Sequence, residues 1–165
     1  MRAITHIIVH HSAGSGGTVD EIRLMHMRDR GWSDIGYHAL ITNGKDLGGA
    51  PSDIACDGMA FQGRPENRAG AHCSNTYGRH NAYTLGVCMT GNYMVSQPSK
   101  AQLLRLSRVI ADWCGRYGIP CDRDHVKGHR EMSGHSSNAC PGDNLFAALD
   151  AVVNTARKRL SAVQV

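Results

Sequence analysis

Three side chains of this sequence are suited to metal chemistry: His10, His129 and Cys140. Two imidazoles and one thiolate are a common ligand set for catalytic zinc, because three protein ligands leave the fourth tetrahedral position open for water. His10 and His11 are neighbours in a strand-like run, so their side chains face opposite sides and at most one can serve a site. The residue types indicate a metal-dependent hydrolase. The alternative is that His10 and His11 are both ordinary polar residues at the end of a strand.

Length and composition favour a folded, soluble chain. The 165 residues suit one domain with one core, and 41% of them are hydrophobic. No apolar run is long enough to span a bilayer. The start of the chain leads directly into a strand-like run and lacks the apolar stretch of a signal peptide, so we expect the protein to be made and folded in the cytoplasm.

The charge of the chain indicates which partners to expect, and its cysteines indicate the redox state. A formal charge of +4 suits an anionic partner such as the cell wall, a membrane surface or nucleic acid. No Lys/Arg run has interleaved aromatics, and aromatics make up only 5%, so we expect no nucleic-acid partner. The six cysteines are expected to be reduced thiols. All except Cys140, which stands in a polar loop, are interpreted as small buried apolar side chains.

Hydrophobic patterning predicts an alternating but loose series of elements. Strands are expected at 4–11, 37–42, 84–90 and 125–128, with Asn43-Gly44 as a hairpin turn into a further short strand and 51–82 as loop. Capping boxes at 18–21 and 99–102 predict two helices that end at Gly31 and Gly118, and a third helix follows the loop 130–142. We therefore expect an α/β fold, a single domain with a central mixed β-sheet flanked by helices.

Several short segments together resemble one enzyme family. They include His10-His11-Ser12-Ala13-Gly14, Gly128-His129-Arg130-Glu131 and Ala139-Cys140-Pro141-Gly142. The others lie at 31–38, 63–64, 70–72, 85–87 and 90–93. In this order they resemble the zinc-dependent N-acetylmuramoyl-L-alanine amidases of type 2, a family that includes amidase-type phage lysozymes and peptidoglycan recognition proteins. Each segment is weak alone, but the set covers about residues 4–150 and is specific.

The resemblance implies roles for particular residues. It implies a zinc site of His10, His129 and Cys140, and so selects His10 over His11. It also implies that Tyr37 lies beside the metal, where its hydroxyl is our candidate donor to the oxyanion of the transition state. Finally, it implies that His72 and Arg64 contact the substrate.

The sequence departs from the family pattern near its last ligand. Many members carry Lys two residues before that ligand, whereas this chain has Asn138, which can donate a hydrogen bond but brings no charge. Losing a charge-assisted donor costs on the order of 10²–10³ in rate if nothing replaces it. His135 in the same loop is a candidate replacement. Glu131 is either a general base or a salt-bridge partner.

The implied activity is zinc-dependent hydrolysis of the amide bond between N-acetylmuramic acid and L-alanine in peptidoglycan. We expect residues 1–165 to form a single catalytic domain without a separate wall-binding module, and to act as a monomer. A phage or prophage endolysin fits best, held in the host cytoplasm until lysis admits it to the wall. The alternatives are a cytoplasmic amidase that recycles muropeptides and a recognition module that binds muropeptide without cutting it.

Overall fold

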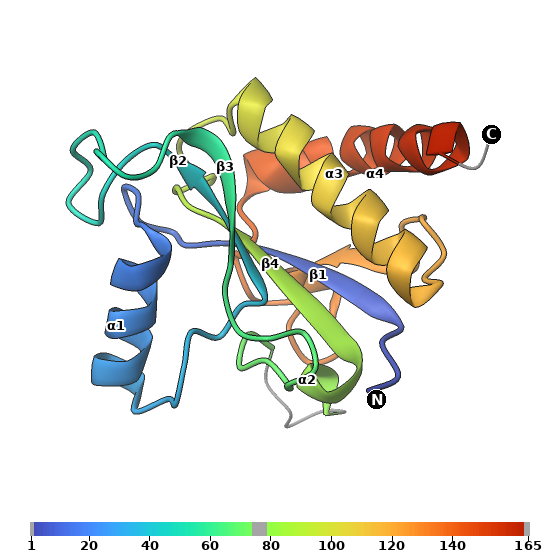
Figure 1. Ribbon diagram of the computed structural model, residues 1–165, viewed down its shortest axis with the longest axis horizontal. Coiled ribbons are helices and arrows are strands. Elements are labelled where there is room, and N and C mark those ends of the chain that lie inside the picture. The colour runs from blue at the N-terminus through green and yellow to red at the C-terminus, as the bar shows by residue number, and fades with distance from the viewer. Residues whose placement is uncertain (1, 74–78, 164–165) are drawn as a thin grey trace.

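A five-stranded mixed β-sheet forms the centre of the computed structural model, which describes residues 2–73 and 79–163 (Figure 1). The strands are β1 (His6–His11), β2 (Ala39–Asn43), β3 (Asp57–Gln62), β4 (Thr84–Met89) and β5 (Val126–Gly128), in the order β3-β2-β4-β1-β5. Four strands run parallel, and β3 pairs antiparallel with β2 at one edge. The expected α/β fold with a mixed sheet, in a single domain, is confirmed.

Helix boundaries follow the signals in the sequence. The helices are α1 (Val19–Arg30), α2 (His80–Tyr83), α3 (Lys100–Tyr117) and α4 (Asp143–Val163), with a 3-10 turn η1 (His129–Glu131). Both capping boxes form, with Thr18 before α1 and Ser99 before α3. Gly31 and Gly118 end these helices in the left-handed conformation that glycine favours. The short α2 has no side-chain cap, and at η1 the Glu131 carboxylate accepts from the backbone N–H of Gly128.

The segment after β2 differs from the prediction. The turn at Gly44 does not lead directly into a hairpin strand. Instead the chain makes a longer loop, closed by a bridge between Lys45 and Pro51, and the partner of β2 is β3. The loop prediction for 51–82 was therefore wrong for β3. An edge strand with the sequence Asp-Gly-Met-Ala-Phe-Gln lacks the β-branched residues that mark a strand, so its pairing with β2 decides its structure.

The two faces of the sheet carry different packing. One face packs on α3 and α4 through a cluster that includes Ile7 and Val9 of β1, while α1 packs on the other face with Leu40 and Cys88. Figure 1 shows α3 and α4 along one side of the sheet and α1 at the opposite side. Because side chains alternate along β1, the face of Ile7 and Val9 is also that of His11, and His10 projects to the side of α1.

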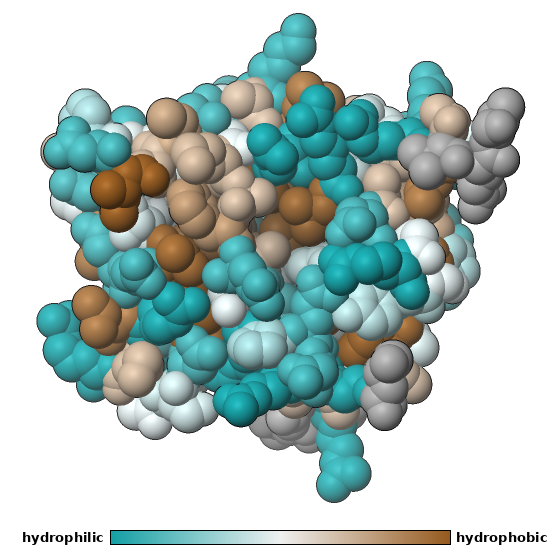
Figure 2. Space-filling model, in the orientation of Figure 1, coloured by the Kyte–Doolittle hydropathy of each residue, from teal (hydrophilic) through white to brown (hydrophobic). Residues whose placement is uncertain are grey.

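The outer surface is mixed. On the face seen in Figure 2, hydrophobic side chains lie among hydrophilic ones and form no continuous band. Across the part of the chain that the structure describes, no helix combines the length and the hydropathy needed to cross a membrane.

Candidate metal centre

His10, His129 and Cys140 come together at one edge of the sheet. Their ligand atoms lie within 4.8 Å of one another. His10 stands at the carboxyl end of β1, and His129 directly follows the neighbouring parallel strand β5. The backbone N–H of Arg130 donates to the Cys140 carbonyl (3.0 Å), which holds the last loop against η1. The sheet order thus brings distant parts of the chain to one point, where carboxyl ends of parallel strands commonly carry sites.

A chain of hydrogen bonds determines which nitrogen of His10 faces this point. The Thr84 hydroxyl donates its hydrogen to the His80 carbonyl (2.8 Å), so it accepts from His72 Nε2, 3.3 Å away. His72 Nδ1 is then the acceptor for the N–H at His10 Nε2, 3.0 Å away. His10 Nδ1 therefore keeps its lone pair, and it lies 3.5 Å from Cys140 Sγ.

The side chain of His11 lies on the opposite face of the sheet from His10. Its Nδ1 accepts from the backbone N–H of Tyr93 (3.2 Å), on the face of the sheet away from His10. Strand alternation and this hydrogen bond together leave His10 as the histidine of β1 that joins the ligand group.

His129 completes the imidazole pair. Its ring centroid lies 4.6 Å from that of His10. Burial lowers the pKa of His129 to about 4, and burial together with nearby His72 and His129 lowers the pKa of His10 well below its ordinary value. Both rings are therefore neutral at pH 7, which is the form that binds a metal. His129 Nε2 is buried without a hydrogen-bond partner among the described residues, an atom that an ion could satisfy.

The thiol of Cys140 completes the donor set. Burial raises its pKa to about 12, although the backbone of His11 and the charge of Arg130 act in the opposite direction. A divalent ion would displace this proton, because the thiolate is the metal-binding form. Two neutral imidazoles and a thiolate fit a borderline-soft ion such as Zn²⁺.

The three side chains line a cavity of about 380 Å³. Its wall also contains Arg30, Trp32, Tyr37, His72 and Asn138. A larger depression of about 620 Å³ continues from the shared residue Ala13 along Asn43, Lys45, Asp57 and Gln102. A substrate in the smaller cavity could therefore extend into the larger one.

Tyr37 lies beside the ligand group, as the resemblance implies. Its ring centroid is 5.2 Å from that of His10 and 5.5 Å from that of His26. Burial raises the pKa of Tyr37 well above 10, and the neighbouring sulfurs of Cys88 and Cys140 add to this. The phenol therefore keeps its proton and can donate a hydrogen bond.

Asn138 also lies in the cavity wall. Its Oδ1 accepts from the backbone N–H of Cys140 (2.9 Å), and its Nδ2 lies 3.5 Å from His129 Nδ1. This bond turns the amide N–H₂ toward the ligand group. The site therefore holds a neutral donor at the position where many family members carry a charge.

The two expected substrate contacts have different surroundings. His72 lines the cavity, but both of its ring nitrogens are engaged within the protein, by His10 and Thr84. Arg64 donates to the carbonyls of Ile35 (2.9 Å), Ala69 (2.8 Å) and Asp34 (3.2 Å), and it does not appear in the cavity wall within the described residues. Contact of either residue with the substrate stays a prediction.

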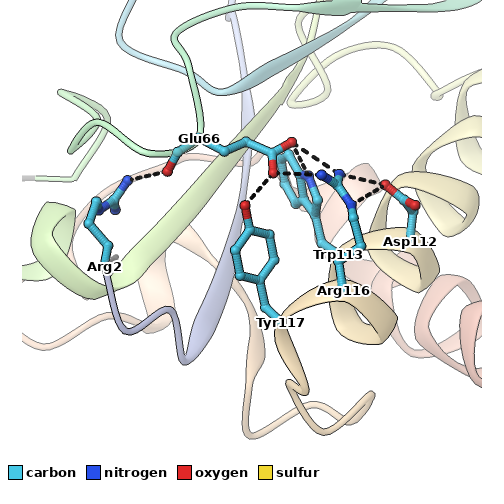
Figure 3. A network of polar contacts seen from close by, with 6 residues as sticks. All are labelled: Arg2, Glu66, Asp112, Trp113, Arg116 and Tyr117. Carbon is cyan, nitrogen blue, oxygen red and sulfur yellow. Dashed lines mark hydrogen bonds and ion pairs between the residues drawn. The ribbon is translucent and has the colours of Figure 1, made fainter.

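A clamp on the other face holds the loop that leads to His72. The Glu66 carboxylate accepts from Tyr117 Oη (2.6 Å), Trp113 Nε1 (2.9 Å) and Arg116 (3.0 and 3.1 Å), as Figure 3 shows. Burial opposes ionisation of Glu66, but these hydrogen bonds outweigh it and lower the pKa of the carboxyl. The Glu66 carbonyl also accepts from Arg2 (2.9 Å), so the loop is tied to α3 and to the N-terminal segment.

Two features of the site are not predictable from the sequence. The support of His10 by His72 and Thr84 is one. The other is Cys73, interpreted as a plain core residue: its Sγ lies 3.7 Å from His135 Nε2, and with His129 these residues form another group of potential ligands. His135 thus contacts Cys73 and His129, while Glu131 accepts from Gly128 N and Arg123. Spacing alone carries no signal for either feature, because both depend on the tertiary fold.

Two solved structures have folds similar to that of this chain. The N-acetylmuramoyl-L-alanine amidase LysC from Clostridium intestinale URNW has a TM-score of 0.72 and 27% identity, with 93% of this chain and 87% of that chain covered. Drosophila PGRP-LB has a TM-score of 0.70 and 26% identity, with 90% and 81% covered.

Comparison of the sequence with known proteins identifies the family of this chain. Peptidoglycan recognition protein 1 from Bos taurus is 30% identical over 151 residues, which is 87% of this chain and 69% of that protein. The family model described as N-acetylmuramoyl-L-alanine amidase, Amidase_2, matches residues 1–143. With most of its length matched by that model, the chain belongs to the N-acetylmuramoyl-L-alanine amidase family Amidase_2.

Proposed function

We propose that this protein hydrolyses the amide bond between N-acetylmuramic acid and L-alanine in peptidoglycan, with zinc held by His10, His129 and Cys140. The observation that carries the proposal is the convergence of these ligands, within 4.8 Å of one another, beside Tyr37 in a member of the amidase family. A recognition module that binds muropeptide has no need of such a ligand set, so catalysis is favoured over binding alone.

The residues around the ligands have separate tasks in this reaction. Zinc, when bound, supplies a Lewis acid and lowers the pKa of coordinated water to around 7. The protonated Tyr37 hydroxyl donates to the oxyanion that develops on the attacked carbonyl. The Asn138 amide adds a neutral donor from the loop that carries Cys140. His72 and Thr84 hold His10 with its Nδ1 lone pair directed at the ligand group.

We further propose that the chain acts as a bacteriolytic endolysin, as a monomeric single catalytic domain that reaches the wall from the host cytoplasm at lysis. A similar solved structure, LysCS from Clostridium intestinale URNW, is described as an endolysin amidase (TM-score 0.72, 27% identity). A muropeptide-recycling amidase would use the same site on soluble fragments. Comparison of turnover on intact sacculi and on soluble muropeptides separates the two roles.

The test of the proposed reaction is mass spectrometry of purified peptidoglycan after incubation with the zinc-loaded protein. We expect stem peptides with a new free amino terminus on L-alanine. The same incubation with a chelator, or with the variant Cys140→Ser, should release none, and added zinc should restore release after chelation. If the protein binds peptidoglycan but creates no such amino terminus, the recognition role replaces the enzymatic one.

A further inference from the structure

A second group of metal-ligating side chains lies next to the first. It consists of Cys73, His129 and His135, whose ligand atoms all lie within 4.8 Å of one another. Cys73 Sγ is 3.7 Å from His135 Nε2, and the ring centroids of His129 and His135 are 4.5 Å apart. Neither Cys73 nor His135 is needed for the centre of His10 and Cys140, so the proposed reaction does not explain this arrangement.

The shared residue can serve both groups. An imidazole has two nitrogens, and neither nitrogen of His129 has a strong hydrogen bond among the described residues. Nε2 is buried without a partner, and Nδ1 has a 3.5 Å contact with the Asn138 amide. Most metal-ligating histidines instead give their second nitrogen to a carboxylate, a carbonyl or water. A neutral imidazole has one lone pair, so His129 serves both groups only when its remaining N–H proton leaves and the ring bridges the two ions as an imidazolate.

The position of Cys73 also differs from that of an ordinary core cysteine. It is 1% exposed and packs with Ile8 and Met132, but its sulfur faces the imidazole of a loop residue. The segment 71–73 runs past both centres, with His72 supporting His10 and Cys73 facing His135. The donors of the second group repeat those of the first, one thiol and two imidazoles, and this set prefers thiophilic divalent ions.

We propose that Cys73, His129 and His135 form a second site for a thiophilic divalent metal ion such as Zn²⁺, which shares His129 with the first centre. The second ion binds more weakly than the first, because the shared imidazole is already bound and the two cations repel each other. The inference concerns metal binding alone and does not depend on the amidase reaction.

Cobalt(II) titration of the metal-free protein tests the proposal, because a thiolate bound to cobalt gives a charge-transfer absorption band. We expect the wild type to bind two equivalents. Cys140→Ser should lose one equivalent and keep one thiolate–cobalt band, which must then come from Cys73. That band should vanish in Cys140→Ser/Cys73→Ser and in Cys140→Ser/His135→Asn. The second double variant leaves the buried thiol in place, so it separates loss of a ligand from loss of packing.

Cys56→Ser is the matched control, because it removes an exposed thiol outside both groups and should leave the stoichiometry unchanged. Circular dichroism of every variant checks the fold. The proposal is overturned if Cys140→Ser shows no thiolate–cobalt band, if that band survives removal of Cys73, or if the wild type binds a single equivalent. The peptidoglycan assay is read independently, so failure of one proposal leaves the other intact.

Discussion

At the scale of single residues, the position of one hydrogen decides whether His10 can bind a metal. The Thr84 hydroxyl gives its hydrogen to the His80 carbonyl and so accepts from His72, which in turn accepts from His10. Each link fixes the tautomer of the next ring. The ligand and its supporting residues therefore act as one unit. Thr84 takes part through His72 and does not itself contact His10 in this series of hydrogen bonds.

Thr84→Val should reduce zinc affinity by about 10–100-fold, as loss of a ligand's supporting partner commonly does. Valine has nearly the same shape but cannot accept from His72, so the tautomers of both rings are no longer fixed. Competition with a chromophoric chelator measures the affinity. Thr42→Val is the matched control, because Thr42 is also buried in the sheet and donates to a carbonyl, that of Cys56. Equal zinc affinity in the Thr84 variant and the wild type would refute the tautomer argument.

Tyr37→Phe should lower the turnover of muropeptide by on the order of 10²–10³ while zinc content stays at the wild-type level. The phenol keeps its proton because burial raises its pKa, and removal of the hydroxyl deletes a donor to the oxyanion. Chromatographic assay of the released peptide and metal analysis of the same sample measure the two quantities. A variant with full turnover would exclude the donor role.

Residue types and the family pattern were sufficient to predict that His10, His129 and Cys140 come together. A metal site needs particular donor atoms, and only a few residue types supply them. The same information was not sufficient for Thr84 or Cys73. Threonine and cysteine in apolar surroundings are common core residues, and their role here comes from contacts with residues distant in the sequence. Likewise, Arg64 matches the motif, but its position depends on a loop path that the sequence does not reveal.

At the scale of elements, the predictable parts are those with local causes. The capping boxes at Thr18 and Ser99 and the glycines after α1 and α3 determine helix ends through bonds within a few residues. The strand β3 has no such local cause. It forms because β2 offers an open edge to it, and its antiparallel register includes an irregularity between Ile41 and Asn43.

Glu66→Gln should lower the free energy of unfolding by roughly 1–3 kcal/mol, the usual cost of leaving buried polar groups without partners. The amide replaces an acceptor oxygen by N–H₂, which then faces the donors of Tyr117, Trp113 or Arg116. Urea unfolding measures the change. Asp112→Asn is the control: Asp112 pairs with the same Arg116 but is exposed, so its loss should cost less than about 1 kcal/mol. Equal effects of the two changes would argue against the clamp.

At the scale of the whole molecule, buried histidines make stability depend on acidity. Burial lowers the pKa of His26 and of His38 from the ordinary 6.5 of histidine to about 4. Between these values the unfolded chain binds more protons than the folded one, so stability is present above pH 6.5 and is lost as the pH falls toward 4. The buried rings of the metal centre act in the same direction.

We therefore expect the free energy of unfolding of the metal-free protein to decrease steadily over this interval. Urea unfolding at a series of pH values measures the slope. His38→Asn should flatten it, because the Asn oxygen can accept from the backbone N–H of Gly86 as His38 Nδ1 does but does not titrate. A slope that is the same in variant and wild type would show that His38 does not contribute.

The separation of the ligands along the chain also has a consequence for synthesis. His10 lies on β1, which pairs with β4 and β5, and both of these strands come much later in the sequence. Cys140 comes later still, in the loop before α4. The proposed catalytic centre therefore cannot assemble until the ribosome has released residue 140. A nascent or prematurely terminated chain that lacks Cys140 carries an incomplete ligand set, so the proposed amidase activity requires translation to pass this residue.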